Sequence, residues 1–215
     1  MLKVWGRRSS FNVQKVLWFI GELGIPYEHI PAGGTFGVRD TPEFLAMNPH
    51  GRVPLIDDGG TVVWESHSIL RYLAARYGRP SFWDEDPGRQ SNADRWMDWS
   101  QTSLQPAFLT GVFWGFYRTP PALRDWTAIK KSIGLCAQYV QLLNQVLSDR
   151  PFLAGDSLTL ADIPTGTNLY RYFELEIQRP HVPNVEAWYE RIKHRVAYRE
   201  HVMIPFDELR GRLDY

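Results

Sequence analysis

Apolar residues near the start of the chain first alternate with polar ones and then change to a helical spacing. Leu2 and Val4 alternate with polar neighbours, which predicts a short first strand. From Val13 to Leu23 apolar residues recur every three or four positions, and Gly24 is the kind of residue that ends a helix. The chain is therefore expected to open with a strand followed by a helix.

The same pattern predicts the next elements. They are a strand at 27–30, a short helix at 42–47, the strands of a hairpin at 55–56 and 62–64, and a helix at 66–77. A chain with this order forms a mixed sheet with helices on both faces. The prediction is an α/β, thioredoxin-like domain with four strands.

After residue 78 the strand signals end. We predict a thioredoxin-like domain at 1–78, a linker at 79–88 that is polar and contains Pro and Gly, and an all-helical domain at 89–215. The helical spacing is found at 90–114, with a bend at Pro106, at 129–147, from 159 onwards, and at 185–192. The pattern Thr159-Leu160-Ala161-Asp162 predicts a capping box at the start of the third of these helices.

Composition and charge exclude several classes of partner. The 24 basic and 24 acidic residues balance, so charge does not favour nucleic acid or an anionic membrane surface. No apolar run approaches the roughly 20 residues of a membrane-spanning helix. A single cysteine, Cys136, cannot form an internal disulfide, which fits a reducing cytoplasm. The six scattered histidines and this cysteine have no metal-ligand spacing, so we expect no metal.

The stretch 48–56 (NPHGRVPLI), followed by 64–69 (WESHSI), is the most specific feature of the sequence. It resembles the glutathione-binding signature of glutathione S-transferases. The resemblance implies a cis peptide bond between Val53 and Pro54, with the backbone of Val53 pairing with the cysteinyl part of glutathione. An extended peptide ligand adds to such an edge like a strand.

Four polar residues of this signature are candidates for holding the charged ends of glutathione. Glu65 and Ser66 start a helix, where amides favour an anion and Glu65 accepts from an ammonium, matching a γ-glutamyl group. The resemblance places Arg52 against the glycine carboxylate, and His50 is a weaker candidate. The alternatives are a plain helix cap at Glu65 and Ser66 and a solvated surface charge at Arg52.

The segment that joins the first strand to the first helix holds three candidates for the sulfur contact. Ser10-x-Asn12-x-x-Lys15 resembles a Ser-x-Pro-x-x-Lys pattern of serine-type members of the family, with asparagine in place of proline. Ser10 is our first candidate for stabilising the thiolate, with Asn12 and Ser9 as alternatives. The alternative is that Ser9 or Ser10 only caps the helix.

Aromatic residues at the end of the long helical pattern are candidates for an electrophile pocket. The family builds one wall of that pocket here, which in this chain implies Phe113, Trp114 and Tyr117, and Arg8 is a candidate for polarising the electrophile. The alternatives are core packing for the aromatic residues and a surface position for Arg8.

The resemblance implies a cytoplasmic glutathione transferase of the detoxifying kind that acts as a homodimer, with glutathione as co-substrate. It would conjugate the glutathione thiolate to a small, hydrophobic electrophile that the sequence does not identify. Two alternatives stay open. One is glutathione-dependent isomerisation or peroxide reduction on the same fold, and the other is a non-catalytic binding module.

Overall fold

The computed structural model describes residues 1–78, 80 and 82–213, and the chain divides into two compact units. Unit 1 comprises Met1–Arg79 and Val196–Ile204, and unit 2 comprises Pro80–Arg195 and Pro205–Leu213. The predicted linker at 79–88 and the predicted end of the second domain at 215 include residues 79, 81, 214 and 215, which lie outside the described residues.

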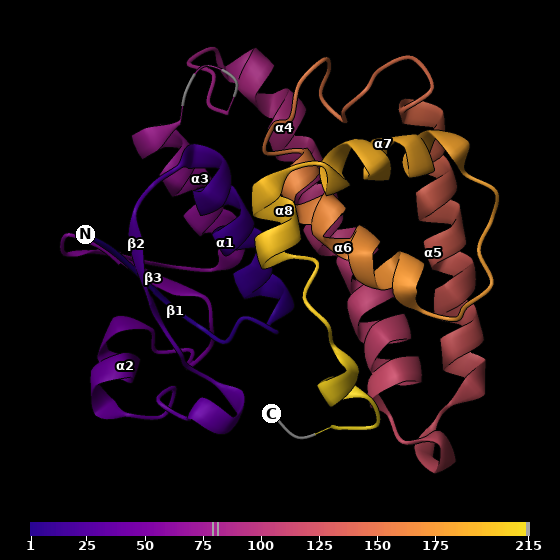
Figure 1. The fold of residues 1–215 in the computed structure, drawn as a ribbon, viewed down its shortest axis with the longest axis horizontal. Helices are drawn as coiled ribbons and strands as arrows, with labels where there is room; N and C mark the ends of the chain where they lie inside the picture. The colour runs from indigo at the N-terminus through magenta and orange to yellow at the C-terminus, as the bar shows by residue number, and fades with distance from the viewer. Residues whose placement is uncertain (79, 81, 214–215) are drawn as a thin grey trace. The chain divides into compact units, whose positions relative to one another are not determined.

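Unit 1 contains a mixed four-stranded sheet in the order β2-β1-β3-β4 (Figure 1). Its strands are β1 (Leu2–Trp5), β2 (Tyr27–Ile30), β3 (Leu55–Asp58) and β4 (Thr61–Trp64). β1 pairs parallel with β2 and antiparallel with β3, and β3 and β4 form the hairpin. The thioredoxin-like plan is confirmed.

The helices of unit 1 bury the apolar residues that the spacing singles out. They are α1 (Phe11–Leu23), α2 (Pro42–Met47) and α3 (Ser66–Tyr77). α1 packs against α3, and α2 lies on the other side of the sheet (Figure 1). Val13, Leu17 and Leu73 have no exposed surface, and each fully buried side chain of this size contributes about 1.5–3 kcal/mol. α1 ends at Gly24, which adopts the left-handed conformation with φ of 65°.

A segment from the C-terminal part of the sequence completes unit 1. Helix α8 (Val196–His201) packs against α1, where Gly21 leaves room for Ala197. The Tyr198 ring meets the Trp18 ring edge-on, with 4.8 Å between their centroids. The sequence groups this segment with the helical domain, because its packing partner is more than 170 positions away and leaves no local signal.

Unit 2 is helical in its described residues. Its longer elements are α4 (Pro87–Trp99), the π-helical segments η2 (Ser100–Leu104) and η3 (Pro106–Arg118), α5 (Trp126–Val146), α6 (Asp162–Glu174) and α7 (Pro183–Lys193). The long helical pattern predicted at 90–114 changes from α-helical to π-helical at Ser100, and Gln105, which separates η2 from η3, keeps right-handed helical dihedral angles. η3 packs along α5, and the start of α6 is buried.

The predicted capping box at the start of α6 is confirmed. Asp162 accepts hydrogen bonds from the backbone N–H of Thr159 and of Leu153, at 2.9 and 3.0 Å. The Thr159 hydroxyl accepts from the N–H of Ala161 at 3.2 Å, and Trp188 Nε1 donates to Asp162 at 3.1 Å. Burial raises the pKa of Asp162 to about 6, although these hydrogen bonds favour the carboxylate. The box thus connects α6, α7 and the preceding loop.

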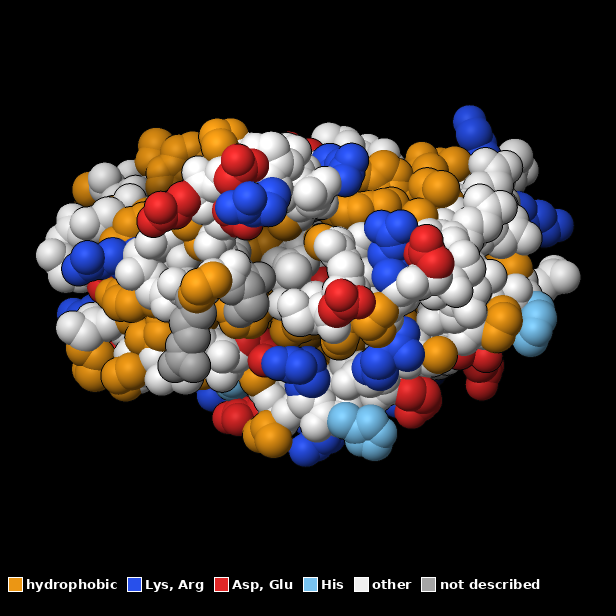
Figure 2. Space-filling view, turned by 90° about the horizontal axis from the view of Figure 1, so that it is seen from above, with side chains coloured by type: hydrophobic (Ala, Val, Ile, Leu, Met, Phe, Trp, Pro, Cys, Tyr) orange, Lys and Arg blue, Asp and Glu red, His pale blue; other side chains and the backbone are white. Residues whose placement is uncertain are grey.

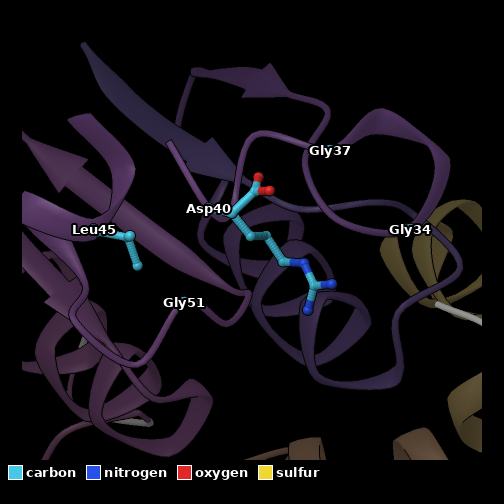
Figure 3. Close-up of a pocket in the computed structure, with 6 residues that line it drawn as sticks. Gly34, Gly37, Asp40, Leu45 and Gly51 are labelled. Atoms are coloured by element: carbon cyan, nitrogen blue, oxygen red, sulfur yellow. The ribbon is translucent and has the colours of Figure 1, made fainter. Parts of the chain in front are cut away.

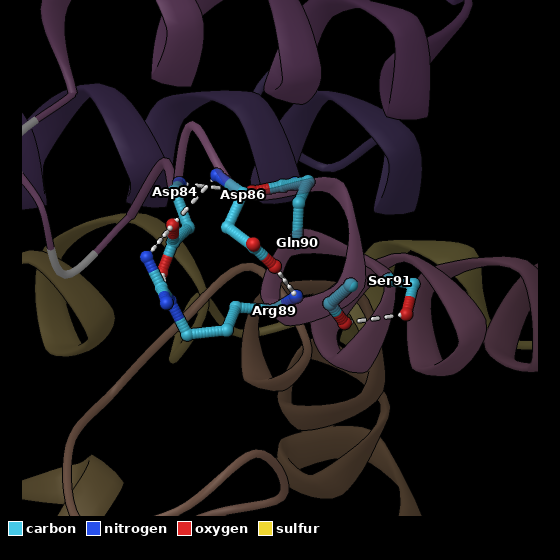
Figure 4. A network of polar contacts seen from close by, with 6 residues as sticks. Asp84, Asp86, Arg89, Gln90 and Ser91 are labelled. Atoms are coloured by element: carbon cyan, nitrogen blue, oxygen red, sulfur yellow. Dashed lines mark hydrogen bonds and ion pairs between the residues drawn. The ribbon is translucent and has the colours of Figure 1, made fainter.

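A second polar network forms the start of α4, inside the segment predicted as linker (Figure 4). Asp86 is the N-cap and accepts from the Arg89 N–H at 2.8 Å, and Pro87 occupies the first turn. The Arg89 guanidinium donates to both oxygens of Asp84, at 2.6 and 3.0 Å. These local bonds start the helix two residues before the predicted second domain begins.

Charged side chains of both signs are interspersed on the face drawn in Figure 2, with apolar side chains between them. This mixture agrees with the balanced composition. Within the described part of the chain, no helix combines the length and the apolar character that crossing a membrane requires.

Candidate functional site

The sheet register brings the segments singled out by the sequence to one edge of unit 1. Trp5 pairs with both Ile30 and Leu55, and Leu55 pairs with Trp64. The segments that follow β1, β2 and β4 therefore emerge at the same edge of the sheet, the one formed by the ends of the strands. The segment that precedes β3 emerges there as well. In particular, Glu65 directly follows Trp64, and Pro54 directly precedes Leu55, the residue that pairs with Trp64. The two halves of the signature are therefore neighbours.

The peptide bond between Val53 and Pro54 is cis, as the resemblance implies. The loop before it is held by Asn48, which is buried and donates from Nδ2 to the Arg52 carbonyl at 2.7 Å. Asn48 Oδ1 also accepts from the His50 N–H at 3.0 Å. Asn48 therefore fixes the backbone that leads into Val53. The sequence does not predict this role, and the only signal for it is that Asn48 begins the signature stretch.

Ser10 is the N-cap residue of α1, but its side chain makes no capping hydrogen bond. Its backbone N–H donates to the Arg7 carbonyl at 3.0 Å, so the turn before the helix is formed by backbone. The first turn of α1 carries no acidic residue. A helix N-terminus without an acidic neighbour attracts an anion, and the half-exposed Ser10 hydroxyl lies beside it.

Glu65 occupies the corresponding position on α3. It is the N-cap, its side chain makes no capping hydrogen bond, and its backbone has φ of 69°. A non-glycine residue at positive φ is strained by about 1–3 kcal/mol, and such strain clusters at functional sites. The Glu65 side chain is exposed and the Ser66 side chain is buried. The first turn of α3 also lacks acidic residues, so an anion fits there while Glu65 is left for a cation.

Arg52 and His50 are both exposed in the loop before β3. A cavity of about 430 Å³ lies beside this loop and is lined by Gly34, Gly37, Arg39, Asp40, Leu45 and Gly51 (Figure 3). Arg39 and Val53 both flank Gly33, because a Cβ built on Gly33 would meet Arg39 Cδ at 3.2 Å and Val53 Cγ2 at 3.6 Å. Arg39 is thus a second basic candidate that the sequence pattern missed.

A buried lysine links the starts of α1 and α3. Lys15 is 1% exposed, and its Nζ lies 3.0 Å from Asn12 Oδ1 and 3.2 Å from His67 Nε2. Desolvation lowers the pKa of Lys15 to about 7, while the Glu65 charge raises it. Desolvation, together with the charges of Lys15 and Arg71, lowers the pKa of His67 to about 2, so this imidazole is neutral.

The candidate pocket residues fall in both units. Arg8 is exposed in unit 1. Burial raises the pKa of the nearby Tyr27, and the positive charge of Arg8 partly opposes this shift. In unit 2, Phe113 and Tyr117 are 1% and 5% exposed and stack at 5.3 Å between centroids, while Trp114 is half-buried against the Arg118 guanidinium. The core alternative accounts for the burial of Phe113 and Tyr117, and their role at a pocket stays a prediction.

Two other kinds of chemistry find little support. Burial raises the pKa of the Cys136 thiol to about 12, so this thiol is protonated and poorly nucleophilic at neutral pH. Among the residues that the structure describes, no three His, Cys, Asp or Glu side chains gather closely enough to hold a metal ion. The polar groups at the sheet edge are therefore the best-supported site.

Family models match both parts of the chain. The glutathione S-transferase N-terminal domain matches residues 5–81, and the glutathione S-transferase C-terminal domain matches residues 107–195. Glutathione S-transferase GstB of Escherichia coli is 41% identical over 207 residues, which cover 95% of this chain and 99% of that protein. Glutathione S-transferase 3 of Zea mays is 31% identical, covering 94% and 93% of the two chains.

Solved structures agree with the sequence comparisons. The theta class glutathione S-transferase of Xanthomonas axonopodis pv. citri with glutathione bound is 41% identical and has a TM-score of 0.89. The alignment covers 95% of this chain and 98% of that one. The apo form of the same enzyme has a TM-score of 0.81.

Proposed function

The chain belongs to the glutathione S-transferase family, and we propose that it conjugates the thiolate of glutathione to a small, hydrophobic electrophile. The single observation that carries this proposal is the pair of uncapped helix N-termini at one sheet edge, where Ser10 starts α1 and Glu65 starts α3. One end suits a thiolate and the other suits the γ-glutamyl group.

The tripeptide is held along the start of β3. The backbone of Val53 pairs with its cysteinyl part, Glu65 accepts from its ammonium, and the amides at Ser66 receive its α-carboxylate. Arg52 stays a candidate for the glycine carboxylate, with His50 as a weaker one. Arg39 is better supported than either, because it is half-buried, lines the cavity beside this loop and flanks Gly33 together with Val53.

The sulfur is held at the start of α1. A thiol with an ordinary pKa near 8.5 is mostly protonated at neutral pH, and a hydrogen bond from the Ser10 hydroxyl together with the helix N-terminus stabilises the thiolate. The thiolate electron pair then forms the carbon–sulfur bond, and the leaving group of the electrophile, where it has one, takes the electrons of the broken bond. Orientation and thiolate stabilisation supply the rate enhancement.

The wider setting follows from this chemistry. A co-substrate that must stay a free thiol suits the reducing cytoplasm. A homodimer and a role in detoxification are part of the proposal, and the apolar side chains of Val62 and Trp64, exposed on the edge strand β4, offer a surface for a second copy. Phe113, Trp114, Tyr117 and Arg8 stay proposed contacts of the electrophile.

The experiment measures glutathione binding and conjugation separately. We expect glutathione and its S-alkyl derivatives to raise the melting temperature, and glutathione to produce thiolate ultraviolet absorbance at neutral pH. An analogue that lacks the α-amino group should bind the wild type more weakly, but should bind Glu65→Gln no more weakly than glutathione does. If glutathione shifts neither the melting temperature nor the absorbance, the proposal is wrong.

The same assay separates the alternatives. A non-catalytic binding module would show a melting shift without thiolate absorbance, whereas an isomerase or peroxidase would show both but transfer no group to a model aryl halide. No observation on the described residues favours either alternative over conjugation.

A further inference from the structure

Lys15 lies in the site region, and the proposed chemistry does not explain why its side chain is buried. A lysine side chain is rarely buried without a partner, and this one is 1% exposed inside unit 1. Its Nζ contacts Asn12 in the first turn of α1 and His67 in the first turn of α3. It also lies over the Phe11 ring, 5.2 Å from the centroid. The lysine therefore touches both helix starts that form the proposed site.

The contact with Asn12 determines how that amide is turned. A lysine ammonium donates and never accepts, so the atom of Asn12 that faces it is the carbonyl oxygen Oδ1. The nitrogen Nδ2, with its two N–H donors, consequently points away from Lys15. Asn12 is half-buried in the first turn of α1, directly after the Ser10 N-cap that the proposed function places at the sulfur.

The contact with His67 fixes the other helix. Because the Lys15 ammonium donates, His67 Nε2 accepts, which places the imidazole proton on Nδ1. His67 directly follows Ser66, whose amide belongs to the turn proposed to hold the γ-glutamyl carboxylate. One ammonium thus holds a residue of each N-terminal turn.

We propose that Lys15 is a positioning residue for glutathione conjugation, which turns the Asn12 amide donor toward the sulfur and ties the first turn of α3 to α1 through His67. The inference rests on the function proposed above. Lys15 touches neither glutathione nor the electrophile, and it acts through Asn12 and His67.

The charged surroundings of Lys15 agree with this role. From α3 it faces Glu65, whose charge favours the ammonium, and His67, with Arg71 one turn further on. Burial opposes the charge on the Lys15 ammonium, and the Glu65 charge partly offsets this effect.

The experiment compares Lys15→Met with Lys15→Arg, and it uses Lys130→Met, an exposed lysine on α5, as the matched control. The measurements are the thiolate absorbance of bound glutathione against pH and the separate kcat and KM values. We expect Lys15→Met to lower the bound thiolate fraction at neutral pH about tenfold, the effect of losing one hydrogen bond to a charged group. Lys15→Arg should restore part of it, and Lys130→Met should behave as the wild type.

The path through Asn12 is tested by combining variants. If Lys15 acts by turning Asn12, Lys15→Met will change the thiolate titration little once Asn12→Ala is present. An unchanged titration in folded Lys15→Met, or an effect that adds fully to that of Asn12→Ala, overturns the proposal. Should Lys15→Met not fold, Asn12→Ala alone decides, because an unchanged titration removes the step on which the proposal depends.

The wild type separates this inference from the proposed function. If the wild type binds no glutathione, both are overturned. If it binds glutathione and forms the thiolate while Lys15→Met does so equally well, only the role of Lys15 fails.

Discussion

Ser10 and Glu65 occupy the same position on two different helices, and neither side chain caps its helix. Ser10 is the N-cap of α1 and Glu65 is the N-cap of α3. The first amides of a helix have no intrahelical acceptor, and serine at this position usually provides one. When the N-cap side chain is not used in this way, the helix start is left to bind a ligand instead. The sheet register places both starts at one edge.

Replacing the Ser10 hydroxyl tests its role at the sulfur. We expect Ser10→Ala to raise the pKa of the bound glutathione thiol and to lower kcat, while glutathione affinity stays within a few-fold. Helix stability should change little, since the hydroxyl makes no capping bond that the variant would lose. Titration of thiolate absorbance and a thermal melt measure the two effects. Ser9→Ala tests the neighbouring hydroxyl in the same way, and a wild-type thiol pKa in Ser10→Ala would shift the role to Asn12 or Ser9.

Arg39 and Arg52 compete for the glycine carboxylate. We expect Arg39→Gln to raise the KM for glutathione about tenfold, the loss of one hydrogen bond to a charged group, and Arg52→Gln to raise it less because Arg52 is exposed. The dipeptide γ-glutamylcysteine, which lacks the glycine, should bind both variants as it binds the wild type. Equal losses with the dipeptide and with glutathione would show that neither arginine acts on that carboxylate.

The positive φ of Glu65 predicts that the residue best suited to binding glutathione is not the residue that gives the most stable backbone at this position. Glycine adopts φ of 69° without strain and alanine does not, so Glu65→Gly should be more stable than Glu65→Ala by about 1 kcal/mol. Both variants remove the carboxylate and should lose glutathione binding to the same extent. Chemical denaturation of the two proteins provides the comparison, and equal stabilities would mean that the backbone at this position carries no strain.

The sequence predicts those parts of the site whose residues lie close together along the chain. The Val53–Pro54 step and the Glu65–Ser66 pair lie within short motifs, and the alternating and helical spacings predict the sheet and helices that bring them together. The contact between Lys15 and His67 joins residues 52 positions apart, and no spacing rule gives that distance. The position of Arg39 and Val53 on either side of Gly33 depends likewise on the fold of the glycine loop at 33–37.

Acid stability should depend on His67. In the unfolded chain its pKa is close to the ordinary 6.5, whereas in the fold burial and the neighbouring Lys15 and Arg71 lower the pKa to about 2. Between these values the unfolded chain binds the proton that the folded protein rejects. This group's contribution to stability is therefore complete above pH 6.5 and is lost as the pH falls toward 2.

The free energy of unfolding falls by about 1.4 kcal/mol for each pH unit below 6.5 through this group. His67→Gln keeps an oxygen that accepts from Lys15 but has no group that titrates in this range. We therefore expect the variant to lose less stability than the wild type between pH 7 and pH 4.5, measured by urea denaturation at each pH. His50→Gln, at an exposed histidine, is the control and should follow the wild-type curve. Parallel curves for the wild type and His67→Gln would contradict the neutral, buried imidazole, and with it the direction of the hydrogen bond from Lys15.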